Sequence, residues 1–104
     1  MKPLMRLEQA ERDAEAAIAW YLQEAPEVVD DFIDALGAAI AHIRRHPGTG
    51  SPRYAHELKL PGLRCWPAGR FPYLLFYMEE PDRLLLVRVL HSRSDIPTWM
   101  LGDA

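Results

Sequence analysis

The spacing of the apolar residues changes once along the chain, at the segment 46–52. Before this segment, apolar residues recur at steps of three and four, which is the period of one face of a helix. After it, they form short runs rich in aromatic residues, Leu and Val, separated by Pro and Gly, which is typical of strands. We therefore expect helices in the first half of the chain and a sheet in the second half.

The first half predicts a helical hairpin. The first helix covers about residues 7–24, and the pattern is then interrupted by Ala25 and Pro26. Pro26 suits the first turn of a second helix, because its missing N–H is not needed there. This second helix covers residues 26–46, and Pro47 ends it.

The second half predicts a sheet. Polar turns, Pro and Gly separate strand candidates at residues 57–60, 63–66, 71–78 and 84–90, and residues 4–7 supply a further edge strand. The fold class is therefore α+β, with an N-terminal helical hairpin packed on a three- to four-stranded antiparallel sheet, in the order β-α-α-β-β-β. A chain of 104 residues is too short for a second domain, so residues 1–104 are expected to form one.

Charge is distributed unevenly around a net value of -3. Residues 1–43 hold 3 basic and 9 acidic side chains, a balance of -6, whereas residues 44–104 hold 9 basic and 6 acidic ones, a balance of +3. The second half is therefore the better place to look for an acidic or polyanionic partner, unless the acidic helices only solvate one face.

Cysteine usage and hydropathy indicate a cytoplasmic protein that does not enter a membrane. Cys65 is the one cysteine of the chain and cannot form an internal disulfide, which suits a reducing compartment. No apolar run approaches the roughly 20 residues of a membrane span. The four histidines are scattered, and no phosphate-binding glycine loop is present, so no metal and no cofactor are expected.

The most unusual polar cluster follows the most apolar strand candidate. In an extended backbone His91, Arg93 and Asp95 would point to one face. Such a trio could bind a phosphodiester, with His91 as an acid or base for RNA cleavage. The alternative is structural: an Arg93–Asp95 pair would then satisfy the end of the strand.

Arginines within the strand region could extend this cluster if they share its face. They are Arg64, Arg70, Arg83 and Arg88. Arg88 lies within an apolar run, so it must either pair with an acid or reach the surface with its stem packed. Cys65 is expected to be a buried free thiol, because it lies inside a strand candidate and away from any helix N-terminus.

Three stretches resemble the RelE/ParE superfamily of toxins of bacterial type II toxin–antitoxin systems. They are residues 60–64 (LPGLR), 71–77 (FPYLLFY) and 86–97 (LVRVLHSRSDIP), and the resemblance covers nearly the whole chain. Ser94 departs from the arginine that commonly precedes the family's aspartate. The resemblance implies the same α+β fold and a role in growth inhibition or plasmid stabilisation.

Two branches of this superfamily act differently. RelE-like members are ribosome-dependent endoribonucleases, and in that case the resemblance assigns catalysis to Arg64, His91 and Arg93. Leu74 stands where this branch has an arginine, Trp99 replaces its C-terminal tyrosine, and the net charge of -3 does not suit work inside a ribosome. The resemblance therefore favours a ParE-like inhibitor of DNA gyrase that has no catalytic residues of its own.

A ParE-like protein is expected to act by binding other proteins. The partner-binding residues would be Arg70, Arg93, Asp95, Trp99, Met100 and Leu101. A ParD-like antitoxin would occupy a groove beside the helical hairpin and a sheet edge, in a heterotetramer or larger complex. No sequence-specific nucleic-acid binding is expected. A degenerate member that only binds its antitoxin is the remaining alternative.

Overall fold

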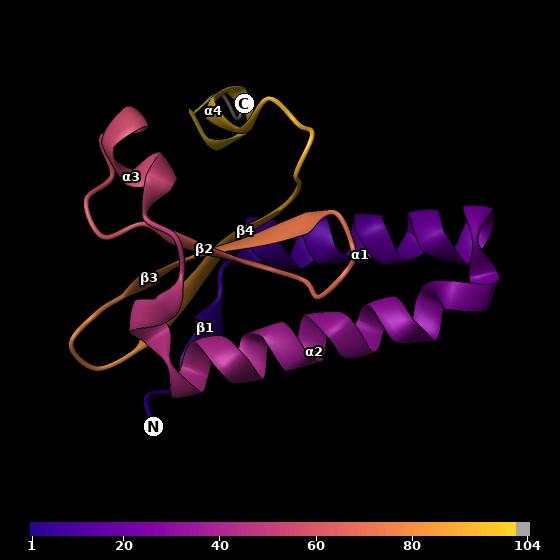
Figure 1. The fold of residues 1–104 in the computed structure, drawn as a ribbon, viewed down its shortest axis with the longest axis horizontal. Helices are drawn as coiled ribbons and strands as arrows, with labels where there is room; N and C mark the ends of the chain where they lie inside the picture. The colour runs from indigo at the N-terminus through magenta and orange to yellow at the C-terminus, as the bar shows by residue number, and fades with distance from the viewer. Residues whose placement is uncertain (102–104) are drawn as a thin grey trace.

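The computed structural model describes residues 1–101, which form four strands, four α-helices and two short 3-10 helices (Figure 1). In chain order these are β1 (Leu4–Arg6), α1 (Glu8–Glu24), η1 (Pro26–Val28), α2 (Val29–Arg45), η2 (Pro47–Thr49), α3 (Arg53–Glu57), β2 (Arg64–Pro67), β3 (Tyr73–Glu79), β4 (Leu84–His91) and α4 (Ile96–Leu101). The expected α+β order is confirmed, with α3 and α4 as additions.

The two helices of the hairpin, α1 and α2, each end close to the residue that the sequence predicted. Ala25 leaves the helical region with φ -151° and ψ 61°, and Pro26 then opens η1. His46 takes a similar conformation before Pro47, which disfavours helical geometry in the residue that precedes it. Arg44 and Arg45 lie in the last turn of α2, where positive charge complements the helix dipole.

The sheet has the strand order β1-β4-β3-β2. The neighbours β2 and β3, and β3 and β4, are antiparallel, as expected, but β1 runs parallel to β4, with Leu4 opposite Leu84. The expectation of an antiparallel sheet is therefore wrong at this edge. Two strands that are joined by a tight turn run antiparallel, and no tight turn joins β1 to β4. Between Phe76 and Tyr77 the register shifts, so that Val87 is an extra residue on β4.

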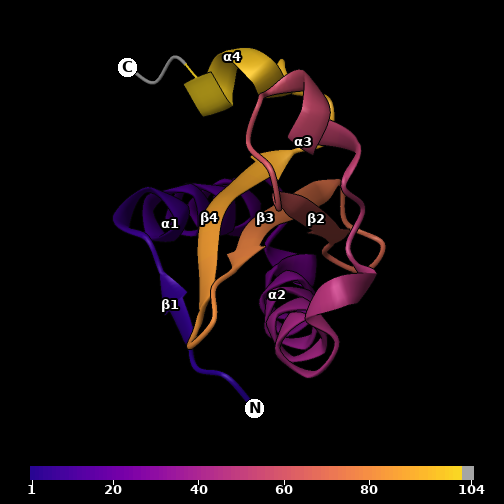
Figure 2. The ribbon, with the colours of Figure 1, turned by 90° about the vertical axis from the view of Figure 1, so that its left-hand side faces the viewer.

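Hydrophobic residues cover both faces of the sheet. The larger core lies between the sheet and the helical hairpin and includes Phe32, Ile43, Leu75 and Tyr77. A second core on the opposite face packs beneath α3 and α4 (Figure 2); it contains Leu58, Leu63, Cys65, Phe76, Leu90 and Ile96. The sheet is therefore a middle layer between the long helices and the two short ones.

The predicted strand at residues 57–60 is absent. Residues 53–57 form α3, and the chain then turns through Lys59, whose φ is 54°. Leu58 is buried in the second core, so its apolar character reflects packing of this turn against the sheet and not strand alternation. A helix of five residues is too short to produce a periodic apolar pattern.

Candidate functional site

An open groove separates α1 from α2 and has the sheet as its floor. It encloses about 200 Å³. The lining residues are Arg6, Ala10, Glu11, Ala14 and Ile18 on one side, Ile33, Leu36, Gly37 and Ile40 on the other, and Leu75, Leu86 and Val89 beneath. Arg6 and Glu11 are the only charged side chains among them. Ile33 keeps 43% of its surface exposed, so the groove presents apolar surface that no part of residues 1–101 covers.

The C-terminal helix α4 forms a second exposed surface. The side chain of Asp95 caps this helix by accepting hydrogen bonds from the Thr98 N–H and hydroxyl, at 3.3 and 2.8 Å. Ile96 is buried and Met100 packs against the second core, whereas Trp99 keeps 52% of its surface exposed. The tail therefore docks on the body through one side and presents a tryptophan to solvent on the other. The side chain of Leu101 lies outside the described part of the structure.

The expected trio of His91, Arg93 and Asp95 does not form one face. Strand β4 ends at His91, and the backbone then turns, so the alternation of side chains stops. The Arg93 N–H donates a hydrogen bond to Nδ1 of His91 at 3.0 Å, while Asp95 caps α4. The ring of His91 packs at right angles on Tyr73. His91 and Asp95 thus have structural partners that a strand pattern cannot predict.

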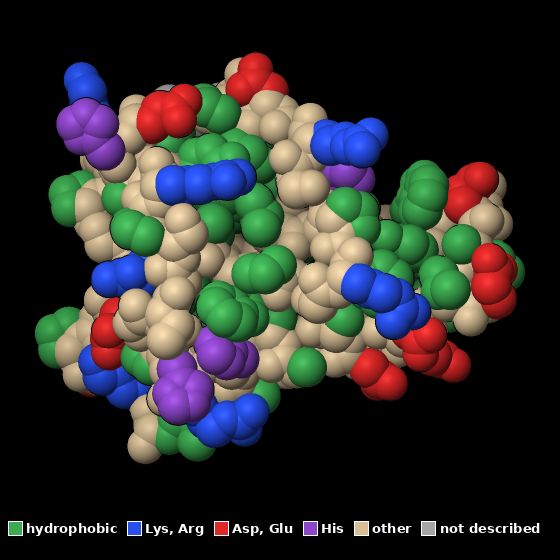
Figure 3. All heavy atoms as spheres, viewed as in Figure 1, with side chains coloured by type: hydrophobic (Ala, Val, Ile, Leu, Met, Phe, Trp, Pro, Cys, Tyr) green, Lys and Arg blue, Asp and Glu red, His purple; other side chains and the backbone are tan. Residues whose placement is uncertain are grey.

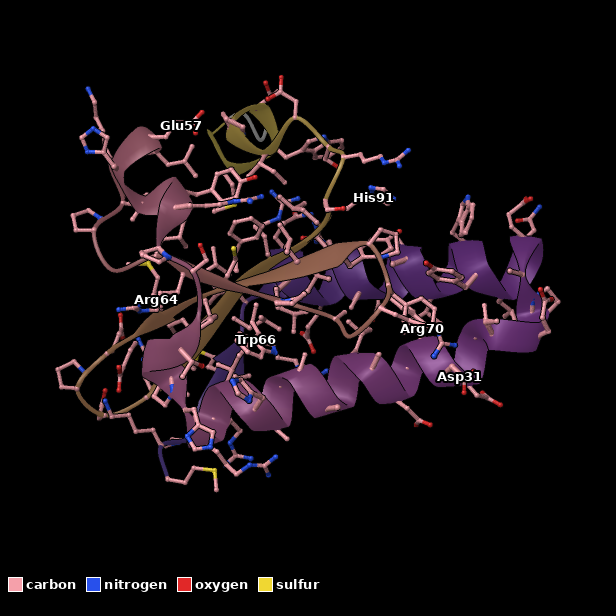
Figure 4. The ribbon with its side chains drawn as sticks, viewed as in Figure 1. Asp31, Glu57, Arg64, Trp66, Arg70 and His91 are labelled. Carbon is pink, nitrogen blue, oxygen red and sulfur yellow. The ribbon has the colours of Figure 1, made fainter. Side chains whose placement is uncertain are left out.

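Arg64 lies far from His91 (Figure 4). On one side of β3, Arg64 is opposite Tyr77, and on the other side His91 is opposite Tyr73. Four residues of strand separate the two positions by about 13 Å along β3 alone. Arg64 donates to the Gly50 carbonyl at 2.8 Å, which holds the loop after α2. Of the three residues of the endoribonuclease alternative, Arg93 lies next to His91, whereas Arg64 lies toward the opposite end of β3.

The other arginines of the strand region have acidic partners. Arg70 contacts Asp31 at 3.4 Å, and Arg83 contacts Glu80 at 2.7 Å; Figure 4 shows Arg70 and Asp31 next to each other. Arg88 binds Asp13 of α1 at 2.7 Å, with about 10% of each side chain exposed. Of the two alternatives for Arg88, pairing with an acid is the one observed. These pairs do not form the continuous cationic patch that the sequence allowed.

The charge asymmetry appears on the surface. In Figure 3, acidic side chains gather on the right, over the tip of the helical hairpin, whereas Lys and Arg side chains are spread over the rest of this face. In the last turn of α2, His42 stacks on Trp66 with ring centroids 3.8 Å apart, and its Nε2 lies 2.8 Å from the Thr49 hydroxyl. Sequence reasoning missed this stack, because 24 positions separate the two rings.

Burial raises the pKa values of two residues of the sheet, Cys65 and Tyr77. Cys65 is a buried free thiol, as predicted, and burial raises its pKa above the ordinary value of 9.0, while Arg53 lowers it slightly. Burial also raises the pKa of Tyr77.

Within residues 1–101, no three His, Cys, Asp or Glu side chains lie together in a way that could hold a metal ion. No helix of this range is long and apolar enough to cross a membrane.

The chain is a small α+β protein with an open apolar groove between two helices and a sheet. The family described as "ParE toxin of type II toxin-antitoxin system, parDE" matches residues 5–96, and the chain belongs to it. A solved structure, "Chromosomal ParDE TA system from P. aeruginosa", has a TM-score of 0.71 and 18% identity, over 88% of this chain and 96% of that one. No curated protein matches the chain.

Proposed function

We propose that this toxin inhibits DNA gyrase by binding it, and that a ParD-like antitoxin neutralises it. The observation that carries the proposal is the match to the ParE toxin family over residues 5–96. The distance between Arg64 and His91 supports action by binding, because general acid–base cleavage of RNA needs its groups within hydrogen-bond reach of one phosphodiester.

The C-terminal surface is the proposed contact for gyrase. Trp99 is half exposed, and exposed aromatic residues next to arginine are common anchors of protein interfaces. Arg93 is exposed in the turn before α4 and supplies the positive charge. Asp95 and Met100 contribute by positioning α4, and Arg70 extends the surface at the end of β3 where Tyr73 pairs with His91. Leu101 completes the proposed set.

The groove between α1 and α2 is the proposed site of the antitoxin. An apolar groove of this kind suits a partner segment that inserts bulky side chains. The two proposed surfaces lie on different elements, so the antitoxin and gyrase need not contact the same residues. The toxin and antitoxin would form a heterotetramer or larger complex in the cytoplasm.

The first experiment is induced expression without the antitoxin, scored for growth, for an SOS reporter and for mRNA integrity in the same culture. Growth arrest with SOS induction and intact mRNA is the expected result, since poisoned gyrase leaves broken DNA. Arrest with cleaved mRNA and a silent reporter would refute gyrase as the target and favour the endoribonuclease. Normal growth with abundant folded protein would indicate a degenerate, non-toxic member.

Two tryptophans provide a matched test of the gyrase contact. Trp99 and Trp20 are 52% and 55% exposed, but Trp20 lies near the tip of the helical hairpin. Trp99→Ala should weaken inhibition of supercoiling by purified gyrase by at least tenfold, as expected for an interface anchor. Trp20→Ala should leave it unchanged. Equal activity of both variants and the wild type would exclude Trp99 from the contact.

A further inference from the structure

Gly37 lies in the interior of α2 without any reason within residues 1–101 to be glycine. A Cβ added at this position meets no heavy atom within 4 Å, and the residue does not have a positive φ. Glycine destabilises the interior of a helix relative to alanine, because it loses more backbone freedom on folding. Contacts inside the described chain therefore do not account for a residue that weakens the helix.

The open space above Gly37 is part of the groove. The α2 wall consists of Ile33, Leu36, Gly37 and Ile40, a spacing of three and four that places all of them along one side of the helix. On α1 the lining runs from Ala10 to Ile18, about 12 Å at the rise of a helix. Gly37 is thus a gap within a wall of large aliphatic side chains, where a partner's backbone can approach most closely.

The walls and floor of the groove indicate which backbone conformation the occupant has. Both walls are α-helices and the floor is the face of the sheet, so backbone groups around the groove pair within the helices and between the strands, and the Val89 N–H at the edge of β4 is held by Asp13. An extended segment would lose hydrogen bonds to water here without replacing them. A helix satisfies its own backbone groups and needs only apolar side chains toward the groove.

The charged side chains along the rim of the groove indicate which side chains flank the apolar side of the helix that would occupy it. Arg6 and Glu11 line the groove, and Glu15 is exposed one helical turn after Glu11 on α1. Residues 8–45, which contain both helices, hold 9 acidic and 3 basic side chains, a balance of -6. An occupant that carries Lys or Arg beside its apolar stripe would complement this rim.

We propose that an amphipathic, basic-flanked helix of the antitoxin crosses α2 at Gly37 with its backbone in close contact, so that Gly37 determines which antitoxin fits. This inference rests on the proposed function, in which the antitoxin occupies the groove. A side chain at position 37 fills the space that the crossing helix needs. Position 37 therefore discriminates between partners, while the free chain tolerates a larger residue.

The test compares Gly37→Ala and Gly37→Leu with Ala38→Leu, which creates the same leucine side chain at an exposed position outside the groove lining and adds one carbon fewer than Gly37→Leu. The binding partner is the purified ParD-like antitoxin that prevents growth arrest when it is coexpressed with this toxin. Gly37→Ala should raise the melting temperature of the free chain by roughly 4 °C and weaken binding severalfold. Gly37→Leu should weaken binding at least tenfold, and Ala38→Leu should change it less than about twofold.

These opposite effects on stability and binding separate a partner contact from a structural role. Gly37→Leu that binds as tightly as the wild type would overturn the inference and leave the proposed antitoxin intact. A lower melting temperature for Gly37→Ala would also overturn it, because glycine would then be required by the fold. Failure of the wild-type chain to bind would instead refute the proposed pairing with that antitoxin.

Discussion

Arg88 on β4 binds Asp13 on α1 through two donors, with Nε 2.7 Å and Nη2 3.0 Å from the carboxylate oxygens. Asp13 also accepts a hydrogen bond from the Val89 N–H at 3.0 Å. Val89 lies beyond the end of β1, so this N–H has no neighbouring strand on that side, and Asp13 is its partner. The remaining nitrogen of Arg88, Nη1, donates to the carbonyl of Trp99 at 2.7 Å. One ion pair thus connects the first helix, the last strand and the C-terminal helix.

Removal of Arg88 should destabilise the fold strongly. Arg88→Ala leaves the buried carboxylate of Asp13 without its counter-charge, so we expect a loss of about 3–5 kcal/mol in the free energy of unfolding. Arg12→Ala is the control, since the Arg12–Glu8 pair is 64% and 79% exposed and should contribute at most about 1 kcal/mol. Urea unfolding of both variants measures the difference. Equal midpoints would show that the buried pair does not stabilise the fold.

Two glycines in one loop should respond differently to alanine. A Cβ at Gly50 would lie 2.3 Å from the hydroxyl oxygen of Tyr77, whereas one at Gly48 meets nothing within 4 Å. The φ of Gly50 is -64°, so the conflict is purely steric. Gly50→Ala should lower the free energy of unfolding by about 1–3 kcal/mol, and Gly48→Ala should change it little. Thermal unfolding of the pair checks this, and a neutral Gly50→Ala would contradict it.

Tyr77 should make stability fall at alkaline pH. Its hydroxyl donates to the Pro47 carbonyl at 2.7 Å and accepts the Gly50 N–H at 3.0 Å, and burial raises its pKa above 10.0. The unfolded chain therefore loses this proton first, so the contribution is complete below pH 10 and is lost as pH rises toward the folded-state pKa.

Tyr77→Phe tests both the hydrogen bonds and the titration. The variant should lose about 1–3 kcal/mol at pH 8, because the buried Gly50 N–H loses its partner. Between pH 8 and 10.5, its urea midpoint should fall less than that of the wild type. Some decline remains, because burial also raises the pKa values of Tyr21 and Tyr73. An identical pH dependence in both proteins would rule out Tyr77 as its source.

Cys65 should react slowly in the folded protein. The thiol is buried and its pKa lies above 9.0, chiefly because of burial, so little thiolate is present or accessible at pH 8. A chromogenic disulfide reagent should label it at least tenfold more slowly in buffer than in 6 M guanidinium. Similar rates in the two conditions would mean that β2 opens readily.

The sequence predicted the elements whose apolar pattern is long and regular. The helical hairpin and the strands at β3 and β4 lie close to their expected ranges because each buries one face over several residues. The shorter helices α3 and α4 were not predicted, and a strand was expected at residues 57–60, where the chain turns after α3. The parallel direction of β1 was also missed, because three residues carry no information about a partner 80 positions away.

The candidate site was predicted only in outline. The groove was expected beside the hairpin, but its wall could not be specified, since Gly37 looks like an ordinary interruption of the α2 stripe. For Arg88 the sequence left open an acidic partner or an exposed position, and it could not identify Asp13, which lies 75 positions earlier. His91 and Asp95 were placed on one face because strand alternation was extended past the residue where β4 ends.

The parallel pairing of β1 with β4 affects when the molecule can become a toxin during its synthesis. The helices depend on local contacts and can form while the ribosome is still at work, but Leu4 cannot meet Leu84 until the last strand has been made. Closing so large a loop is slow relative to helix formation. The floor of the groove includes Leu86 and Val89, so the surface that a neutralising partner would recognise comes into being only as translation finishes.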